Sequence, residues 1–146
     1  MSKILVVGGA GYIGSHMVQM LYEDGIEPVV LDNLSTGFAE SVINAELVIG
    51  DLADKQLLQS LFTDHQFIAV VHFAAFSQVG ESIQQPAKYY HNNIANTQNL
   101  LNAMCSADVK HLVFSSTAAV YGTPKVDFIT EEHALNPINP YGRTKL

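Results

Sequence analysis

Tyr141 and Lys145 stand four residues apart, a spacing that could form a proton-transfer pair. On a helix, residues four apart lie on one face, so the two side chains would be neighbours. A phenol has a pKa near 10 and is a poor base at neutral pH, but nearby cations favour the phenolate. Lowering that pKa by ~3 units requires roughly 4 kcal/mol, which two cations in a dry site can supply. The pair is a candidate for removing a proton from a bound alcohol, and an ordinary surface Tyr/Lys pair is the alternative.

Three hydroxyl side chains, Ser115-Ser116-Thr117, follow the apolar run 110–114. A hydroxyl there could hold a substrate oxygen and relay its proton to Tyr141. Ser and Thr are also frequent in strand-end turns, which is the alternative interpretation. The six histidines lack metal-ligand spacing and no G-x-S-x-G segment is present, so the sequence predicts neither a metal site nor a serine hydrolase.

A glycine-rich turn, Gly8–Gly14, lies between an apolar run at 3–7 and a segment with helical periodicity at 12–24. Glycines allow a tight turn and leave no Cβ between the backbone and a phosphate. The N-terminus of the following helix offers free N–H groups and partial positive charge to an anion. A strand, glycine turn and helix in this order predict a dinucleotide pyrophosphate site.

Two acidic residues follow the next two apolar runs. Asp32 stands eighteen residues after Gly14, where a carboxylate can accept hydrogen bonds from the two ribose hydroxyls of the adenosine half. Its charge would repel a 2′-phosphate, so NAD is favoured over NADP, although Asp32 could instead only cap a turn. Asp51 could bind the adenine amino group while Leu52 packs on the ring, or Asp51 or Asp54 could cap a helix.

The periodicity alternates strands and helices along the whole chain. Strands are expected at 3–7, 28–31, 46–49, 69–75 and 110–114, and helices at 12–24, 54–62, 86–107 and from Tyr141. In the helix at 86–107, one face is expected to carry Tyr90, Ile94, Thr97, Leu101 and Met104, and Cys105 is expected to be packed and inert. This order predicts an α/β fold, a Rossmann-type doubly wound parallel sheet, with ligands bound outside the carboxyl ends of the strands.

The length of 146 residues allows one core, and the net charge of −7 disfavours nucleic acid or an anionic membrane as the main partner. No run is long enough to span a membrane. We expect no signal peptide, because no long apolar stretch follows a charged segment at the start. A single cysteine permits no internal disulfide, which fits a cytoplasmic protein. Because the net charge is negative, any phosphate site must be built locally from backbone N–H groups and a few cations.

Several longer phrases together resemble the extended short-chain dehydrogenase/reductases, and within them the branch of UDP-glucose 4-epimerases. These phrases, in chain order, are the glycine turn continuing to His16, Asp32-Asn33, Gly50–Leu52, His72–Ala75, Val79–Ser82, Tyr89–Asn93, Ser115–Gly122 and Asn139–Lys145. The resemblance implies epimerisation at C4 of a UDP-hexose through transient oxidation to a 4-keto sugar, with NAD as cofactor, in galactose metabolism. It also implies that Thr117 and Tyr141 act on the sugar 4-hydroxyl and that Lys145 binds the nicotinamide ribose.

The resemblance assigns the NAD contacts residue by residue. They are Gly8, Gly11, Tyr12, Ile13 and Gly14 at the pyrophosphate, Asp32, Asn33, Ser35, Thr36 and Gly37 at the ribose, Asp51 and Leu52 at adenine, and Phe73, Ala74, Ala75, Ser77, Asn92, Ser115, Tyr141 and Lys145 further along the cofactor. Position 77 is Ser where some epimerases carry lysine, and Thr117 stands where many carry Ser. The dehydratase branch places an acidic residue at the position of Ala118, so dehydration is disfavoured.

Members of that family are roughly twice as long as this chain. We therefore expect residues 1–146 to be a truncated NAD-binding domain, with a sheet that is incomplete at its C-terminal edge and no substrate domain. Epimerase activity, UDP-sugar binding and a homodimer are expected of the intact protein, while the 146 residues alone are expected to be inactive and doubtful as a dimer. The alternatives are another nucleotide-sugar epimerase or decarboxylase of the same family, or an NAD-binding module without activity.

Overall fold

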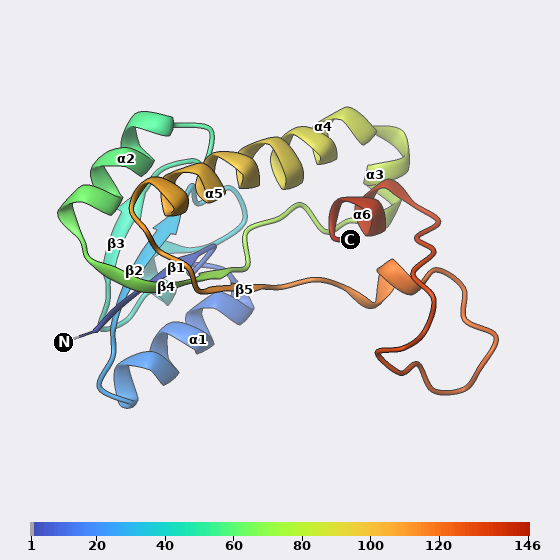
Figure 1. Ribbon diagram of the computed structural model, residues 1–146, viewed down its shortest axis with the longest axis horizontal. Coiled ribbons are helices and arrows are strands. Elements are labelled where there is room, and N and C mark those ends of the chain that lie inside the picture. The colour runs from blue at the N-terminus through green and yellow to red at the C-terminus, as the bar shows by residue number, and fades with distance from the viewer. Residues whose placement is uncertain (1) are drawn as a thin grey trace. The chain divides into compact units, whose positions relative to one another are not determined.

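The computed structural model describes residues 2–146 and contains a parallel sheet of five strands (Figure 1). The strands are β1 (Lys3–Val7), β2 (Glu27–Asp32), β3 (Glu46–Ile49), β4 (Phe67–His72) and β5 (Leu112–Phe114). Their spatial order is β3-β2-β1-β4-β5, and all four pairings are parallel. This is the strand order of a doubly wound dinucleotide-binding fold, so the predicted fold class is confirmed.

The chain groups into two compact units, which are described separately. The first contains the residues up to Ala74 together with Asn96–Phe114, and the second contains Ala75–Ala95 and Ser115–Leu146. Within the first unit, α1 (Tyr12–Glu23) covers one face of the sheet, and α2 (Lys55–Asp64) and α5 (Asn96–Ser106) cover the other (Figure 1).

Alternation along β1 explains the two layers of the core in the first unit. Leu5 and Val7 belong to the cluster that packs under α2 and α5, whereas Ile4 and Val6 belong to the cluster that packs under α1. Successive strand residues point to opposite faces, so a strand that is buried on both sides must be apolar throughout. The sheet is less well covered at β5, which pairs with β4 alone among the described residues and leaves Val113 exposed.

The second unit contains short helices and turns. They are α3 (Val79–Gln84), α4 (Pro86–Tyr90), a π-helical turn (His91–Ala95), a 3-10 turn (Ala118–Tyr121) and α6 (Pro140–Thr144). The helix α6 packs against α3, α4 and the 3-10 turn. No helix within residues 2–146 is long and apolar enough to cross a bilayer.

The π-helical turn corrects the face that we predicted for the segment 86–107. Tyr90 and Ile94 are exposed, whereas Met104 is buried and Leu101 packs partly buried on the core, as predicted. The other buried residues of this stretch are Tyr89, Asn93, Asn96 and Leu100. A π turn inserts an extra residue into the helical repeat, so a stripe drawn at 3.6 residues per turn loses register across it. The prediction of a packed Cys105 is also wrong, because its side chain is exposed.

Other boundaries differ as well. The strand β4 ends at His72 rather than Ala75, because the next two amides, of Phe73 and Ala74, both donate to the carbonyl of Val7. The helix α3 was not predicted. A six-residue helix with a glycine and no side-chain cap gives little periodic signal.

Candidate functional site

The glycine turn joins β1 to α1 and leaves the first turn of that helix open. Gly11 caps α1 without a side-chain hydrogen bond, and Tyr12 is 84% exposed. The first N–H groups of a helix have no intrahelical acceptor, so this end can bind an anion. The order of strand, glycine turn and helix is thus the one that the sequence predicts.

At two positions of the turn there is no room for a side chain, so only glycine fits. A Cβ on Gly8, which has a φ of +80°, would lie 2.6 Å from the backbone nitrogen of Ala74. A Cβ on Gly14 would collide with the carbonyl oxygen of Gly8. The backbone of β1, the end of β4 and α1 therefore meet in a cradle that side chains would fill, and this cradle fits a pyrophosphate.

Asp32 at the end of β2 connects the glycine turn to the following loop. One carboxylate oxygen accepts from the amide of Ala10 at 2.9 Å, and the other accepts from the amide of Leu34 at 2.8 Å. The loop also folds back onto the turn, because the amide of Phe38 donates to the carbonyl of Ala10. Asp32 therefore caps a turn beside the predicted pyrophosphate cradle, and its role toward the ribose stays a prediction.

Asp51 lies in a polar cluster next to this loop. Its carboxylate accepts from Asn33 Nδ2 at 2.6 Å, from the amide of Ala53 at 2.8 Å and from Asn96 Nδ2 at 3.3 Å. The cap of α2 is Asp54, whose Oδ1 accepts from the amides of Gln56 and Leu57. Asp51 is therefore not that cap, while the neighbouring Leu52 is buried in the core under α2 and α5.

The second unit carries the predicted proton-transfer residues. Asn139 caps α6 by accepting from the amide of Gly142 at 2.7 Å, and Pro140 occupies its first position. Tyr141 lies in the first turn of α6, and Lys145 follows its last residue. Gly142 is needed for close packing, because a Cβ there would lie 2.7 Å from the carbonyl oxygen of Ala119.

Lys145 is the most perturbed titratable group of this set. It is 4% exposed, and burial lowers the pKa of its ammonium from 10.5 to about 8. Thr117 precedes the 3-10 turn and accepts from the amide of Ala119 through its hydroxyl oxygen at 3.2 Å. In the same unit, Ser116 Oγ donates to the carbonyl of Lys145 at 2.7 Å.

Sequence reasoning missed two polar residues of the second unit. Asn93 in the π-helical turn and Thr144 in α6 are both buried and hydrogen-bonded to each other at 2.9 Å. Nothing in the local sequence signals this pairing, because it joins segments 51 residues apart. The cap at Asn139, by contrast, could have been found from Asn followed by Pro at a helix start.

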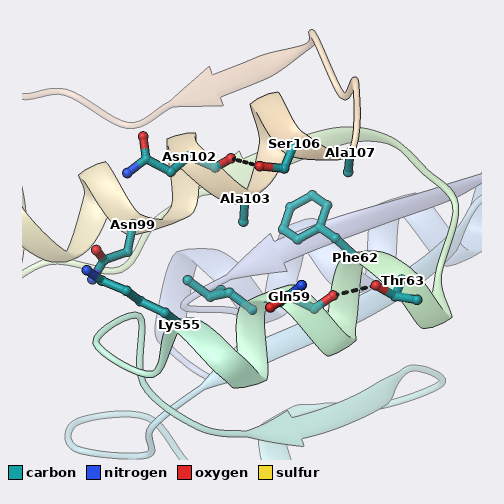
Figure 2. A pocket seen from close by; sticks show the side chains of 10 residues that line it. Lys55, Gln59, Phe62, Thr63, Asn99, Asn102, Ala103, Ser106 and Ala107 are labelled. Atoms are coloured by element: carbon teal, nitrogen blue, oxygen red, sulfur yellow. Dashed lines mark hydrogen bonds between the residues drawn. The ribbon is translucent and has the colours of Figure 1, made fainter.

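A pocket of about 430 Å³ between α2 and α5 contains none of the predicted site residues (Figure 2). Leu58, Phe62 and Ala103 line its apolar part, and Lys55 and Asn99 stand at one end. The hydroxyls of Thr63 and Ser106 donate to backbone carbonyls of their own helices, so they are not free to donate to a ligand. The pocket is separate from the motifs that point to chemistry.

Residues 4–146 match the model of the NAD dependent epimerase/dehydratase family, and the chain belongs to that family. It is 52% identical to the UDP-glucose 4-epimerases of Halalkalibacterium halodurans and Lactobacillus helveticus, over 98% and 99% of this chain and 43% and 44% of those proteins. The crystal structure of UDP-glucose 4-epimerase from Brucella ovis in complex with NAD superposes with a TM-score of 0.96 at 48% identity, covering 99% of this chain and 45% of that one. The chain thus spans less than half the length of the relatives it matches.

Proposed function

We propose that the full-length protein is an NAD-dependent epimerase that inverts C4 of a UDP-hexose and interconverts UDP-glucose and UDP-galactose in galactose metabolism. The observation that carries this proposal is the 52% identity to UDP-glucose 4-epimerases over nearly the whole chain. The presence of Thr117, Tyr141 and Lys145 supports it. The proposal places the enzyme in the cytoplasm, as a homodimer of the full-length protein.

The first unit fits the adenosine and pyrophosphate half of NAD. The cradle at Gly8 and Gly14 would take the pyrophosphate beside Tyr12 and Ile13, and Asp32 would hold the ribose hydroxyls. The other residues proposed to contact NAD are Gly11, Asn33, Ser35, Thr36, Gly37, Asp51, Leu52, Phe73, Ala74, Ala75, Ser77, Asn92, Ser115, Tyr141 and Lys145.

The proposed chemistry uses three side chains of the second unit. NAD, when bound, supplies the hydride acceptor and donor for sugar C4. Tyr141 as phenolate takes the proton of the 4-hydroxyl, directly or through Thr117, and returns it after the planar 4-keto sugar has turned over. With a pKa of about 8, Lys145 is mostly protonated at pH 7, so it would supply the cation of the proposed pair.

A second candidate is another nucleotide-sugar epimerase or a decarboxylase of the same family. A structural relative at 45% identity is described as a UDP-Glc/GlcNAc 4-epimerase from Campylobacter jejuni, with a TM-score of 0.95 over 99% of this chain and 46% of that one. An N-acetylated sugar is therefore the first alternative substrate to test. For residues 1–146 alone, an NAD-binding module without activity is the alternative.

The decisive experiment measures sugar turnover and the amount of bound NAD in the same protein preparation. The full-length gene product is purified, NAD released by denaturation is quantified, and interconversion of UDP-glucose and UDP-galactose is followed, with UDP-N-acetylglucosamine and UDP-glucuronate as competing substrates. Bound NAD and fastest turnover of the plain hexoses are expected. Preference for another sugar would select the second candidate, and NAD without any turnover would leave only a binding module. The 146-residue chain, assayed in parallel, is expected to show no turnover.

The Asp32→Asn variant is expected to weaken NAD binding by about tenfold and to reduce the preference for NAD over NADP. An asparagine keeps one acceptor oxygen, so only one of the amides of Ala10 and Leu34 retains its partner. It also removes the charge that would repel a 2′-phosphate. Titration of both dinucleotides into the apo protein checks this, with Asp24→Asn at the exposed end of α1 as the matched control. An unchanged NAD/NADP ratio would contradict the assignment of Asp32.

A further inference from the structure

The helix α6 carries Tyr141 and is followed directly by Lys145. Within the second unit it packs against α3, α4 and the 3-10 turn, and these contacts help to set the positions of both residues. The cap at Asn139 fixes its beginning, but a cap alone does not fix rotation about the helix axis.

Thr144 links α6 to the π-helical turn through its hydroxyl group. Its hydroxyl is buried, with the residue 5% exposed, and donates to the carbonyl of Tyr141 at 2.8 Å. The same oxygen accepts from Asn93 Nδ2 at 2.9 Å. One hydroxyl thus links the residue that carries the phenol to a side chain outside α6.

The side-chain amide of Asn93 is fixed in place by hydrogen bonds. It is 3% exposed, its Oδ1 accepts from the amide of Phe76 at 2.9 Å and from Asn92 Nδ2 at 2.9 Å, and its Nδ2 also donates to the carbonyl of Phe76 at 3.0 Å. Both donors and both acceptor sites of this amide are therefore satisfied. A buried amide with every hydrogen bond made is a rigid anchor, because any rotation leaves a polar group unpaired.

We propose that Thr144 is a positioning residue for the proton-transfer pair: its hydroxyl ties α6 to Asn93 and so fixes the directions of Tyr141 and Lys145. Thr144 stands three residues after Tyr141 and immediately before Lys145, so a rotation of α6 that breaks this bond moves both side chains. Thr144 touches neither sugar nor cofactor in this proposal, which rests on the proposed epimerase function.

The test replaces the hydroxyl by a methyl group of the same size. In the full-length gene product loaded with NAD, Thr144→Val is expected to lower kcat for UDP-galactose by about tenfold with KM changed less than about twofold. Thr144→Ser, which keeps the hydroxyl, is expected to stay within about twofold of the parent. Thr130→Val, the same change at an exposed loop residue, is the matched control. Amide hydrogen exchange at Arg143 and Lys145 is expected to accelerate in Thr144→Val alone.

The measurements of kcat and of hydrogen exchange each test the positioning role of Thr144. Equal kcat and equal exchange in Thr144→Val and the parent would overturn the proposal, and so would a Ser variant as slow as the Val variant. If the parent itself has no turnover, the proposed function fails. Hydrogen exchange then still tests whether the bond between Thr144 and Asn93 holds α6 in place. If Thr144→Val does not fold, Thr144→Ala replaces it under the same criteria.

Discussion

Replacing Gly14 by alanine is expected to abolish NAD retention, with a loss of affinity of at least about 100-fold, and to destabilise the fold by roughly 2–4 kcal/mol. The added Cβ would collide with the carbonyl oxygen of Gly8 and would lie 2.7 Å from Gly9 Cα. All these neighbours are backbone, so no side chain can swing away. Relief requires α1 to move away from the end of β1, which opens the cradle proposed for the pyrophosphate.

The matched control is Gly80→Ala in α3, where a Cβ meets nothing within 4 Å. Alanine there is expected to be neutral or to stabilise by about 0.5–1 kcal/mol, because glycine loses more conformational entropy on folding. Urea unfolding and the NAD content after gel filtration distinguish the two variants. A Gly14→Ala protein that retains NAD and the stability of the parent would show that the turn tolerates a side chain, contrary to this close packing.

The glycine turn could be predicted because its requirements are local. The apolar run at 3–7, the glycines and the helical periodicity after Tyr12 lie within one short stretch, and Asp32 follows at the next strand end. The alternation of these elements then determines the parallel sheet through general rules of chain connection. The parallel sheet, and the places of Asp32 at the end of β2 and Asp51 just after β3, therefore followed from the sequence.

The features that escaped prediction depend on contacts between distant segments. The π-helical turn shifts the buried face of the segment 86–107, and its stabilising bonds run from Asn93 to Phe76 and Thr144. Periodicity alone placed the exposed Tyr90 and Ile94 on the same face as the buried Met104, because it assumes a uniform helical repeat. The roles of Phe73, Ser77 and Asn92 toward NAD came only from the family resemblance and stay predictions.

Replacing Lys145 by methionine is expected to stabilise the fold at pH 7, by an amount on the order of 2–3 kcal/mol, while removing the cation of the proposed proton-transfer pair. Burial lowers the pKa of this ammonium from 10.5 to about 8, so carrying the charge costs free energy in the folded state. Methionine has a similar length and no charge to desolvate. Such a gain would show that Lys145 lowers stability at the position proposed for proton transfer, which is the trade-off expected at a catalytic site.

The pH dependence distinguishes desolvation from a packing effect. Between pH 8 and about 10.5 the unfolded chain binds more protons at Lys145 than the folded chain does, so the free energy of unfolding of the parent rises with pH. The advantage of Lys145→Met should therefore be largest below pH 8 and shrink across that window. Lys110→Met is the control, because Lys110 forms an exposed ion pair with Asp108 and its loss should change stability by less than about 1 kcal/mol at any pH. A gain in Lys145→Met that does not vary with pH would mean that better packing, rather than a buried charge, explains the difference in stability.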